Sequence, residues 1–189
     1  MATVDKDSAN WRLFGGGGLL VGGLLWLIAV IVGIAAAGSA IAAWIAIIGV
    51  LVIGVALFLV AFGETGSNGA VGASLFGKAV LVAFGLGWIV FGLVWLLAAV
   101  GVSAPQVVLL IAGVLVVVGG ILSTFAIWQR AVARGAARWV LAVPVVLSIL
   151  FVISALGWVI ITHWWLPALL ALAFLVTGLL YLLNRRDIG

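Results

Sequence analysis

The sequence predicts an all-α integral membrane protein that folds as a bundle of six transmembrane helices. Of its 189 residues, 68% are hydrophobic and only 6% are charged, whereas a soluble domain is about half apolar and about a quarter charged. The apolar residues form six runs of roughly the 20 residues that a helix needs to cross a bilayer. The basic residues all fall between alternate runs. Such a chain cannot cover a soluble surface, so soluble enzymes and nucleic-acid-binding proteins are excluded.

Each expected span ends at small residues, at a polar loop or close to a proline. Gly38 and Ser39 divide the first long apolar stretch in two, and the polar, glycine-rich segment 64–74 forms a loop. Ser103 and Pro105 suit the start of a helix as cap and first-turn residue, and Pro144 is expected to kink the fifth span. The six expected spans are 14–37, 40–62, 77–100, 105–127, 139–161 and 166–183.

The positions of the basic residues predict the topology. With six spans, all eight lie on the side of the N-terminus, the loops after the second and fourth spans, and the C-terminus: Lys6, Arg12, Lys78, Arg130, Arg134, Arg138, Arg185 and Arg186. Basic residues concentrate on the cytoplasmic side of membrane proteins. We therefore expect a single transmembrane domain, 14–183, in the cell's inner (plasma) membrane, with segments 1–13 and 184–189 in the cytoplasm.

The spans also suggest three tandem helical hairpins, at about 14–62, 77–127 and 139–183. Each hairpin has a short outer turn, a second helix with central glycines and a polar or basic inner connection. The glycines of Gly49–Gly54 in the second span resemble those of Gly113–Gly120 in the fourth, and Val176–Tyr181 is a weaker echo in the sixth. Three parallel repeats differ from the inverted repeats of many secondary transporters.

Six spans in a chain of this length, with glycine-bearing hairpins and basic inner loops, resemble the HdeD-like membrane proteins, which are associated with acid resistance. The stretch Thr124–Trp139, in which a Trp-Gln-Arg helix end leads into the next hairpin, carries most of the resemblance. The chain departs from the family pattern at its first outer turn, which has Gly38-Ser39 where the family often has proline. The resemblance implies a stress-response role and transfers no catalytic residues.

Residues for catalysis or cofactor binding are scarce. The sequence has no cysteine and one histidine, and no ionisable residue falls in the middle of an expected span, where proton relays and ion paths would need one. We therefore expect no enzyme activity, no cofactor and no metal site. Glu64 and Lys78 bracket a loop as boundary residues, and His163, in an aromatic segment, is either an interfacial residue or a sensor of acid, because its ordinary pKa is about 6.5.

Three groups of residues are candidates for contacts with lipids or with other helices. Arg130, Arg134 and Arg138 recur every four residues, so a helical extension would present them to lipid headgroups on one side. The glycines proposed for helix packing are Gly18, Gly22, Gly49, Gly54, Gly113 and Gly120. They would close the bundle or join it to a second copy, so membrane lipids and either a homo-oligomer or another membrane protein are the expected partners.

The ten tryptophans divide into two sets. Five lie at expected membrane interfaces, where amphipathic rings concentrate: Trp11, Trp128, Trp139, Trp164 and Trp165. The other five lie deeper, where they pack between helices, face acyl chains or line a pocket: Trp26, Trp44, Trp88, Trp95 and Trp158.

Three functions remain open from the sequence. The first is a non-enzymatic stress or acid-resistance membrane protein of the HdeD-like type. The second is an accessory subunit of a larger membrane complex, and the third is a small carrier or channel for a neutral or lipophilic solute. All three place the function within the bilayer, because the connections between the spans are short.

Overall fold

The computed structural model describes residues 11–62, 69–130, 135–157 and 164–183, and within them the regular elements are all helices joined by short turns. A π-helix, Trp11–Gly16, continues directly into α1, and a 3-10 helix, Gly135–Arg138, precedes α5. Six helical segments are long and apolar enough to cross a membrane. The helices are α1 Gly17–Ala35, α2 Ala40–Phe62, α3 Leu75–Ala99, α4 Gln106–Arg130, α5 Ala142–Ala155 and α6 Trp165–Leu183.

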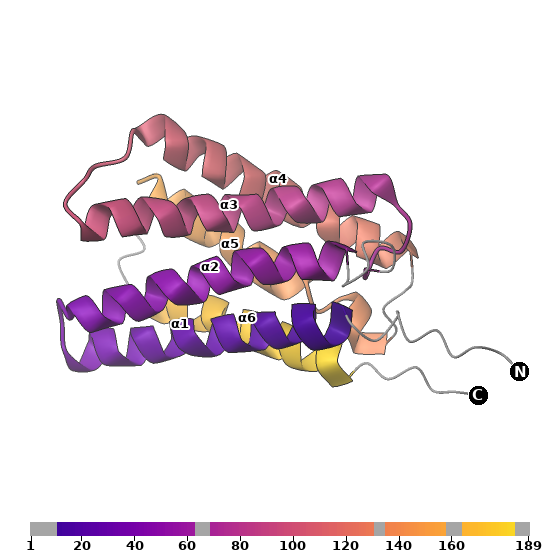
Figure 1. The fold of residues 1–189 in the computed structure, drawn as a ribbon, viewed down its shortest axis with the longest axis horizontal. Coiled ribbons are helices and arrows are strands. Elements are labelled where there is room, and N and C mark those ends of the chain that lie inside the picture. Colours follow the sequence, from indigo (N-terminus) through magenta and orange to yellow (C-terminus); the bar gives the residue numbers. More distant parts are fainter. Residues whose placement is uncertain (1–10, 63–68, 131–134, 158–163, 184–189) are drawn as a thin grey trace, which may run out of the picture.

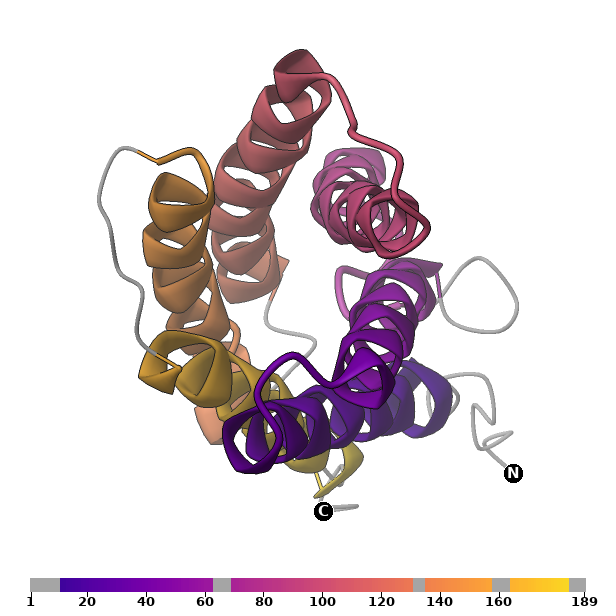
Figure 2. The same cartoon turned by 90° about the vertical axis from the view of Figure 1, so that its left-hand side faces the viewer.

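The helices run back and forth along one axis and form a closed ring (Figures 1 and 2). Each helix packs against its neighbours in the chain, and α6 packs against α1 to complete the ring. The ring surrounds a core that is made almost entirely of aliphatic and aromatic side chains. An all-helical bundle suits a bilayer, because helices satisfy their backbone hydrogen bonds internally.

The two ends of the ring differ in charge. The charged side chains of the described residues are Arg12, Lys78, Arg130 and Arg138, and all lie at the end where α1 and α3 begin and α4 ends. We call this the basic end. At the other end, the non-basic end, α1, α3 and α5 finish, and a glycine with positive φ follows each of them: Gly38 at 79°, Gly101 at 81° and Gly157 at 75°.

Glycines set the closest approaches between helices. A Cβ added at Gly22 of α1 would lie 2.8 Å from the carbonyl oxygen of Gly49 on α2, and one added at Gly54 of α2 would lie 2.9 Å from that of Gly85 on α3. Across the α1–α6 contact, a Cβ at Gly23 would lie 2.6 Å from the backbone nitrogen of Leu175. At these contacts the backbones themselves touch, as small residues allow in membrane helices.

Helix α5 departs most from its expected form. The sequence predicted a span over 139–161 with a kink at Pro144, but the regular helix is Ala142–Ala155 and Pro144 lies in its first turn. The predicted kink is therefore wrong. Proline lacks an N–H and its ring clashes with the carbonyl four residues earlier, so a helix tolerates it in the first turn but not further along. Gly157, with positive φ, follows the end of the helix.

Trp11, which the sequence predicts at a membrane interface, is buried between helices at the basic end. Its side chain is only 1% exposed, and its ring packs edge-on against Tyr181 of α6, with centroids 5.4 Å apart. The π-helix that carries Trp11 packs against both α2 and α6. Gly15 and Gly16 permit this, since an added Cβ would meet Val60 of α2 or Tyr181 of α6. The start of the first helical segment is therefore part of the core at the basic end.

Candidate functional site

A cluster of aromatic rings fills the middle of the helix ring. Trp26 of α1 packs edge-on against Trp88 of α3, with centroids 5.5 Å apart, and both rings contact Phe151 of α5 at 5.8 Å. Phe174 of α6 contacts Trp88 at 5.5 Å. Edge-to-face pairs at these separations are favourable beyond the area they bury. The cluster therefore joins four of the six helices through one set of ring contacts.

A cavity of about 360 Å³ lies beside this cluster, between α3, α4, α5 and α6. Phe91, Trp95 and Phe151 line it with aromatic rings, and Leu109 of α4 adds an aliphatic wall. Ser154 and Pro167 also line it, from the last turn of α5 and the first turn of α6. Since those turns lie at the non-basic end, the cavity does too. We call it the aromatic cavity.

The depth of the aromatic cavity follows from helix geometry. Phe91 precedes the end of α3 at Ala99 by eight residues, and at 1.5 Å per residue this places it about 12 Å inside the ring. Phe91 is fully buried, whereas Ala155, which also lines the cavity, is exposed near the end of α5. The cavity therefore reaches from the non-basic end of the ring down to the aromatic cluster.

An unused hydrogen-bond donor lies next to the cavity wall. The Trp88 side chain is fully buried, and its indole Nε1–H has no hydrogen-bond partner among the described residues. Its ring contacts two residues of the wall, Phe91 at 5.9 Å and Phe151 at 5.8 Å. Ser123 Oγ and the Tyr181 hydroxyl are likewise buried without a partner in the described part of the chain. Buried polar groups usually have partners, so these three atoms stand out in an interior that is mostly apolar.

Other interior hydroxyls bond to their own helices. Ser148 donates to the carbonyl oxygen of Pro144 at 2.6 Å, and Thr177 donates to that of Ala173 at 2.7 Å. This bond to the preceding turn is the usual way in which membrane helices accommodate serine and threonine. Within the described residues, no group of three or more His, Asp or Glu side chains is close enough to hold a metal ion.

The six glycines predicted to pack helices all lie against other elements of the ring. Gly18 faces the Ala56 side chain of α2, and Gly22 faces Gly49. Gly54 faces Gly85. Gly113 and Gly120 of α4 instead meet valine side chains of α5, Val152 and Val145. These α4 glycines therefore contact side chains of α5, whereas Gly22 and Gly23 of α1 contact the backbone of the neighbouring helix.

The three arginines predicted to share one helical face do not form a continuous set in the described residues. Arg130 is exposed at the end of α4, Arg134 lies outside the described residues, and Arg138 lies in the separate 3-10 helix. The Arg138 guanidinium donates from Nε to the carbonyl oxygen of Trp128 at 2.9 Å and also donates to it from Nη2. It lies over the Trp128 ring as well, 5.6 Å from the centroid. Arg138 therefore caps the end of α4.

The deeper tryptophans have different environments. Trp26 and Trp88 pack in the aromatic cluster and Trp95 lines the cavity. Trp44 is 45% exposed on the outside of the ring, so it neither lines a pocket nor packs between helices. Trp158 and His163 lie outside the described residues. Of the predicted interfacial set, Trp128, Trp139, Trp164 and Trp165 are exposed near helix ends, as expected.

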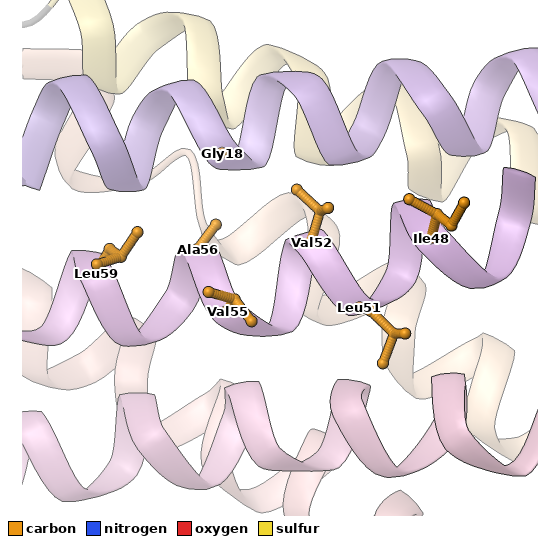
Figure 3. Close-up of a pocket in the computed structure, with 7 residues that line it drawn as sticks. All are labelled: Gly18, Ile48, Leu51, Val52, Val55, Ala56 and Leu59. Atoms are coloured by element: carbon orange, nitrogen blue, oxygen red, sulfur yellow. The ribbon is translucent and has the colours of Figure 1, made fainter.

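The outside of the ring is apolar, and it contains shallow hollows of a different kind. One follows α2 from Ile48 to Leu59 beside Gly18 of α1, encloses about 290 Å³ and is lined by hydrocarbon (Figure 3). Large aliphatic side chains are exposed on all six helices, for example Ile31, Ile48 and Leu93. An exposed apolar surface of this extent marks contact with lipid or with other proteins.

Sequence reasoning did not identify the aromatic cavity. The sequence left open whether deep tryptophans such as Trp95 line a pocket, and it indicated no role for Phe91, Phe151 or Leu109. The only signals were the aromatic residues spaced along the third span, at 88, 91 and 95, and one in the fifth. Whether these aromatic side chains contact one another depends on how the third and fifth spans are arranged in the ring.

Comparisons with known protein families, with curated proteins and with solved structures found no match to this chain. The class of protein is therefore assigned from its sequence and structure alone. Six helices long and apolar enough to cross a membrane, with apolar side chains exposed on their outer faces, define a multi-pass membrane protein.

Proposed function

We propose that this chain is a non-enzymatic protein of the cell's inner (plasma) membrane that acts within the bilayer, in a stress or acid-resistance role of the HdeD-like kind. The non-enzymatic part of the proposal is supported by the distance between the charged side chains and the apolar interior of the helix ring. The charged side chains of the described residues lie at the basic end, while the interior is lined by aliphatic and aromatic side chains. Catalytic sites need a convergent acid, base, nucleophile or metal set. The physiological part rests on the resemblance around Thr124–Trp139.

The topology belongs to the same proposal. The basic end, where the first helical segment begins and α6 ends, faces the cytoplasm, since basic residues favour that side. The six helices would be three tandem hairpins of one ancestral unit. Besides the glycine patterns of the sequence, the positive-φ glycines that follow α1, α3 and α5 at the non-basic end, Gly38, Gly101 and Gly157, support this repeat.

Deleting the gene tests the physiological role. We expect the deletion strain to survive an acid challenge less well than its parent, with equal growth at neutral pH, and we expect a plasmid copy to restore survival. Equal survival of parent and deletion strain would contradict the acid-resistance role. The comparison at neutral pH separates a specific acid phenotype from a general membrane defect.

Lipids and other copies of the chain are the proposed partners. Arg130, Arg134 and Arg138 would attract anionic headgroups at the basic end, by about 1 kcal/mol for each basic residue near the surface. Native mass spectrometry of gently extracted protein tests this. We expect one chain mass, or a multiple of it, with anionic lipid attached, and less lipid after Arg130→Ala. A constant second protein mass would instead make the chain an accessory subunit of a larger complex.

One observation favours a second function. The aromatic cavity opens toward the non-basic end and contains no charged side chain among the residues that line it, as expected for a carrier of a neutral or lipophilic solute. Transport requires access from both sides in turn, so flux in proteoliposomes is the test. Flux equal to that of empty liposomes would remove this second function and leave the first unaffected.

A further inference from the structure

We propose that the aromatic cavity is a binding site for a neutral, ring-containing lipophilic small molecule with one hydrogen-bonding group. The site is made by Phe91 and Trp95 of α3, Leu109 of α4, Phe151 and Ser154 of α5, and Pro167 of α6. This inference does not depend on an acid-resistance role, because it rests on the geometry of the cavity alone.

The size of the cavity sets the size of the ligand. An apolar protein cavity of about 150 Å³ is known to bind benzene, and small-molecule sites span about 300–1,000 Å³. At about 360 Å³, the aromatic cavity has room for a molecule of roughly two such rings. The α3 residues that line it, from Phe91 to Trp95, span about 6 Å of helix, so the ligand is compact rather than extended.

The charge of the ligand follows from the residues around it. The four acidic residues of the chain are Asp5, Asp7, Glu64 and Asp187, and none falls in α1 to α6. The basic side chains of the described helices lie at the opposite end from the cavity. A charged ligand would therefore lose its hydration in the cavity without gaining a counter-charge, which is costly. A neutral ligand avoids this cost.

The chemistry of the wall sets the kind of ligand. Phe91, Trp95 and Phe151 present three rings, and the Trp95 and Phe151 rings are already arranged edge-on, with centroids 6.0 Å apart. A ring-containing ligand can add to such an arrangement by the same edge-to-face contacts. Ser154, half-buried in the last turn of α5, supplies a hydroxyl oxygen that can accept a hydrogen bond from one polar group of the ligand. Beneath the wall, Trp88 carries the buried indole N–H without a partner in the described residues.

Helix α5 is the wall most easily displaced for entry. It is the shortest of the six helices, with 14 residues, and the α4 glycines that face it, Gly113 and Gly120, meet valine side chains. Around α1, by contrast, glycines meet the backbone of the neighbouring helix. We therefore assign entry of the ligand to the non-basic end beside α5.

The test uses 6-bromo-2-naphthol as probe, a neutral two-ring molecule with one hydroxyl and a heavy atom that quenches nearby indoles. The protein is placed in nanodiscs of unbrominated lipid, and the probe-dependent loss of tryptophan fluorescence is measured with and without excess 2-naphthol. We expect a saturable component that 2-naphthol displaces and that is smaller in the Trp95→Phe variant, because Trp95 lines the cavity while Trp26 and Trp88 lie behind its wall. Quenching that rises linearly with probe and is insensitive to 2-naphthol would overturn the proposal, because it reports partition into the bilayer.

Two variants fill the cavity, and a third controls for added bulk. Ala155→Phe and Leu109→Trp add a ring to the cavity from α5 and from α4, and each is expected to weaken saturable binding at least tenfold. Ala99→Phe adds the same ring at an exposed position on α3, at the same end of the bundle but outside the cavity, and is expected to bind like the parent. Equal binding by the parent and both filled variants would overturn the proposal.

A membrane lipid could occupy the cavity instead of a small molecule, and a second experiment distinguishes the two. The same protein is placed in nanodiscs whose lipid is brominated along its acyl chains. If Ala155→Phe removes brominated-lipid quenching of Trp95 and 2-naphthol has no effect on that quenching, the cavity holds an acyl chain and the proposal is wrong. If 2-naphthol relieves the quenching, the small-molecule site is supported. Ser154→Ala tests the polar contact and is expected to weaken binding about fivefold, the usual effect of losing one hydrogen bond.

Discussion

Closure of the ring between α1 and α6 depends on Gly23, and replacing this glycine with alanine tests the packing. A Cβ at position 23 would lie 2.6 Å from the Leu175 nitrogen and 2.8 Å from the Ala171 oxygen, whereas ordinary van der Waals contact begins at 3.4 Å. Both neighbours are backbone atoms of α6, so no side-chain rotation relieves the overlap. The two helices must separate by up to about 0.8 Å.

The free-energy cost follows from this separation. A gap of 0.5–1 Å forfeits a quarter to a half of each dispersion contact that it opens, and inserting a methyl into a packed core costs about 1–3 kcal/mol. Alanine regains up to about 1 kcal/mol because it favours helix more than glycine does. We therefore expect Gly23→Ala to lower the free energy of unfolding by up to about 2 kcal/mol.

Gly17→Ala is the matched control, because Gly17 lies in the same helix and an added Cβ would meet no atom within 4 Å. We expect it to be neutral or slightly stabilising. Equilibrium unfolding in mixed micelles of increasing SDS fraction, followed by tryptophan fluorescence, gives the free energy of each variant. Equal stability of the Gly17 and Gly23 variants would refute the account of backbone contact between α1 and α6.

Three further pairs of substitutions test individual contacts in the same assay. Arg138→Ala removes the cap on the Trp128 carbonyl and should destabilise the protein by about 1–2 kcal/mol, whereas Arg130→Ala, at an exposed position, should change stability by less than about 0.5 kcal/mol. Trp88→Phe removes an indole N–H that has no partner in the described residues, so it should cost far less than Trp88→Ala, for which about 3–5 kcal/mol is expected; similar losses for both would show that the N–H is bonded. Tyr181→Phe should be neutral or stabilising, because the hydroxyl is buried without a partner in the described part of the chain. Trp11→Ala should destabilise the protein by about 3–5 kcal/mol, because it empties the space beside Tyr181. A Trp11→Ala variant as stable as the parent would contradict the buried position of that ring.

The sequence predicts the number of helices well because the signal is simple. Long apolar runs interrupted at Gly38, at 64–74 and at Pro105 leave few other ways to divide the chain. Five of the six predicted spans agree with the helices of the structure to within a few residues at each end. The fifth is the exception, because its apolar composition continues past Ala155 while Pro144 and Gly157 limit the regular helix.

The sequence does not predict which residues face the interior. In a soluble helix an alternation of polar and apolar residues marks the buried face, but here both the lipid-facing and the interior faces are apolar. Trp26 and Trp44 therefore look alike in the sequence, yet one is 2% exposed and the other 45%. Trp11 is misleading for the same reason, since the basic residue beside it suggests an interface while the ring is buried.

The sequence does not predict the aromatic cavity or the pairing of helices that are distant in the chain. Its lining comes from four helices, and the contact of α6 with α1 that completes the ring joins residues more than 100 positions apart, such as Gly23 and Leu175. Glycine patterns indicate that helices approach closely, but they do not say which partner each helix chooses. The sequence therefore predicts that these glycines lie at helix contacts, but it does not predict which helices they bring together.

The most direct test of the account is whether the two ends of the ring lie on opposite sides of the membrane. The chain has no cysteine, so single cysteines can be introduced without background at Ser39 and Ser103, in the turns of the non-basic end, and at Ala136, an exposed residue of the basic end. Intact cells are treated with a membrane-impermeant maleimide. We predict that Ser39→Cys and Ser103→Cys are labelled in intact cells and that Ala136→Cys is labelled only after permeabilisation. Labelling of all three in intact cells, or of Ala136→Cys alone, would contradict a six-span protein with its basic end in the cytoplasm.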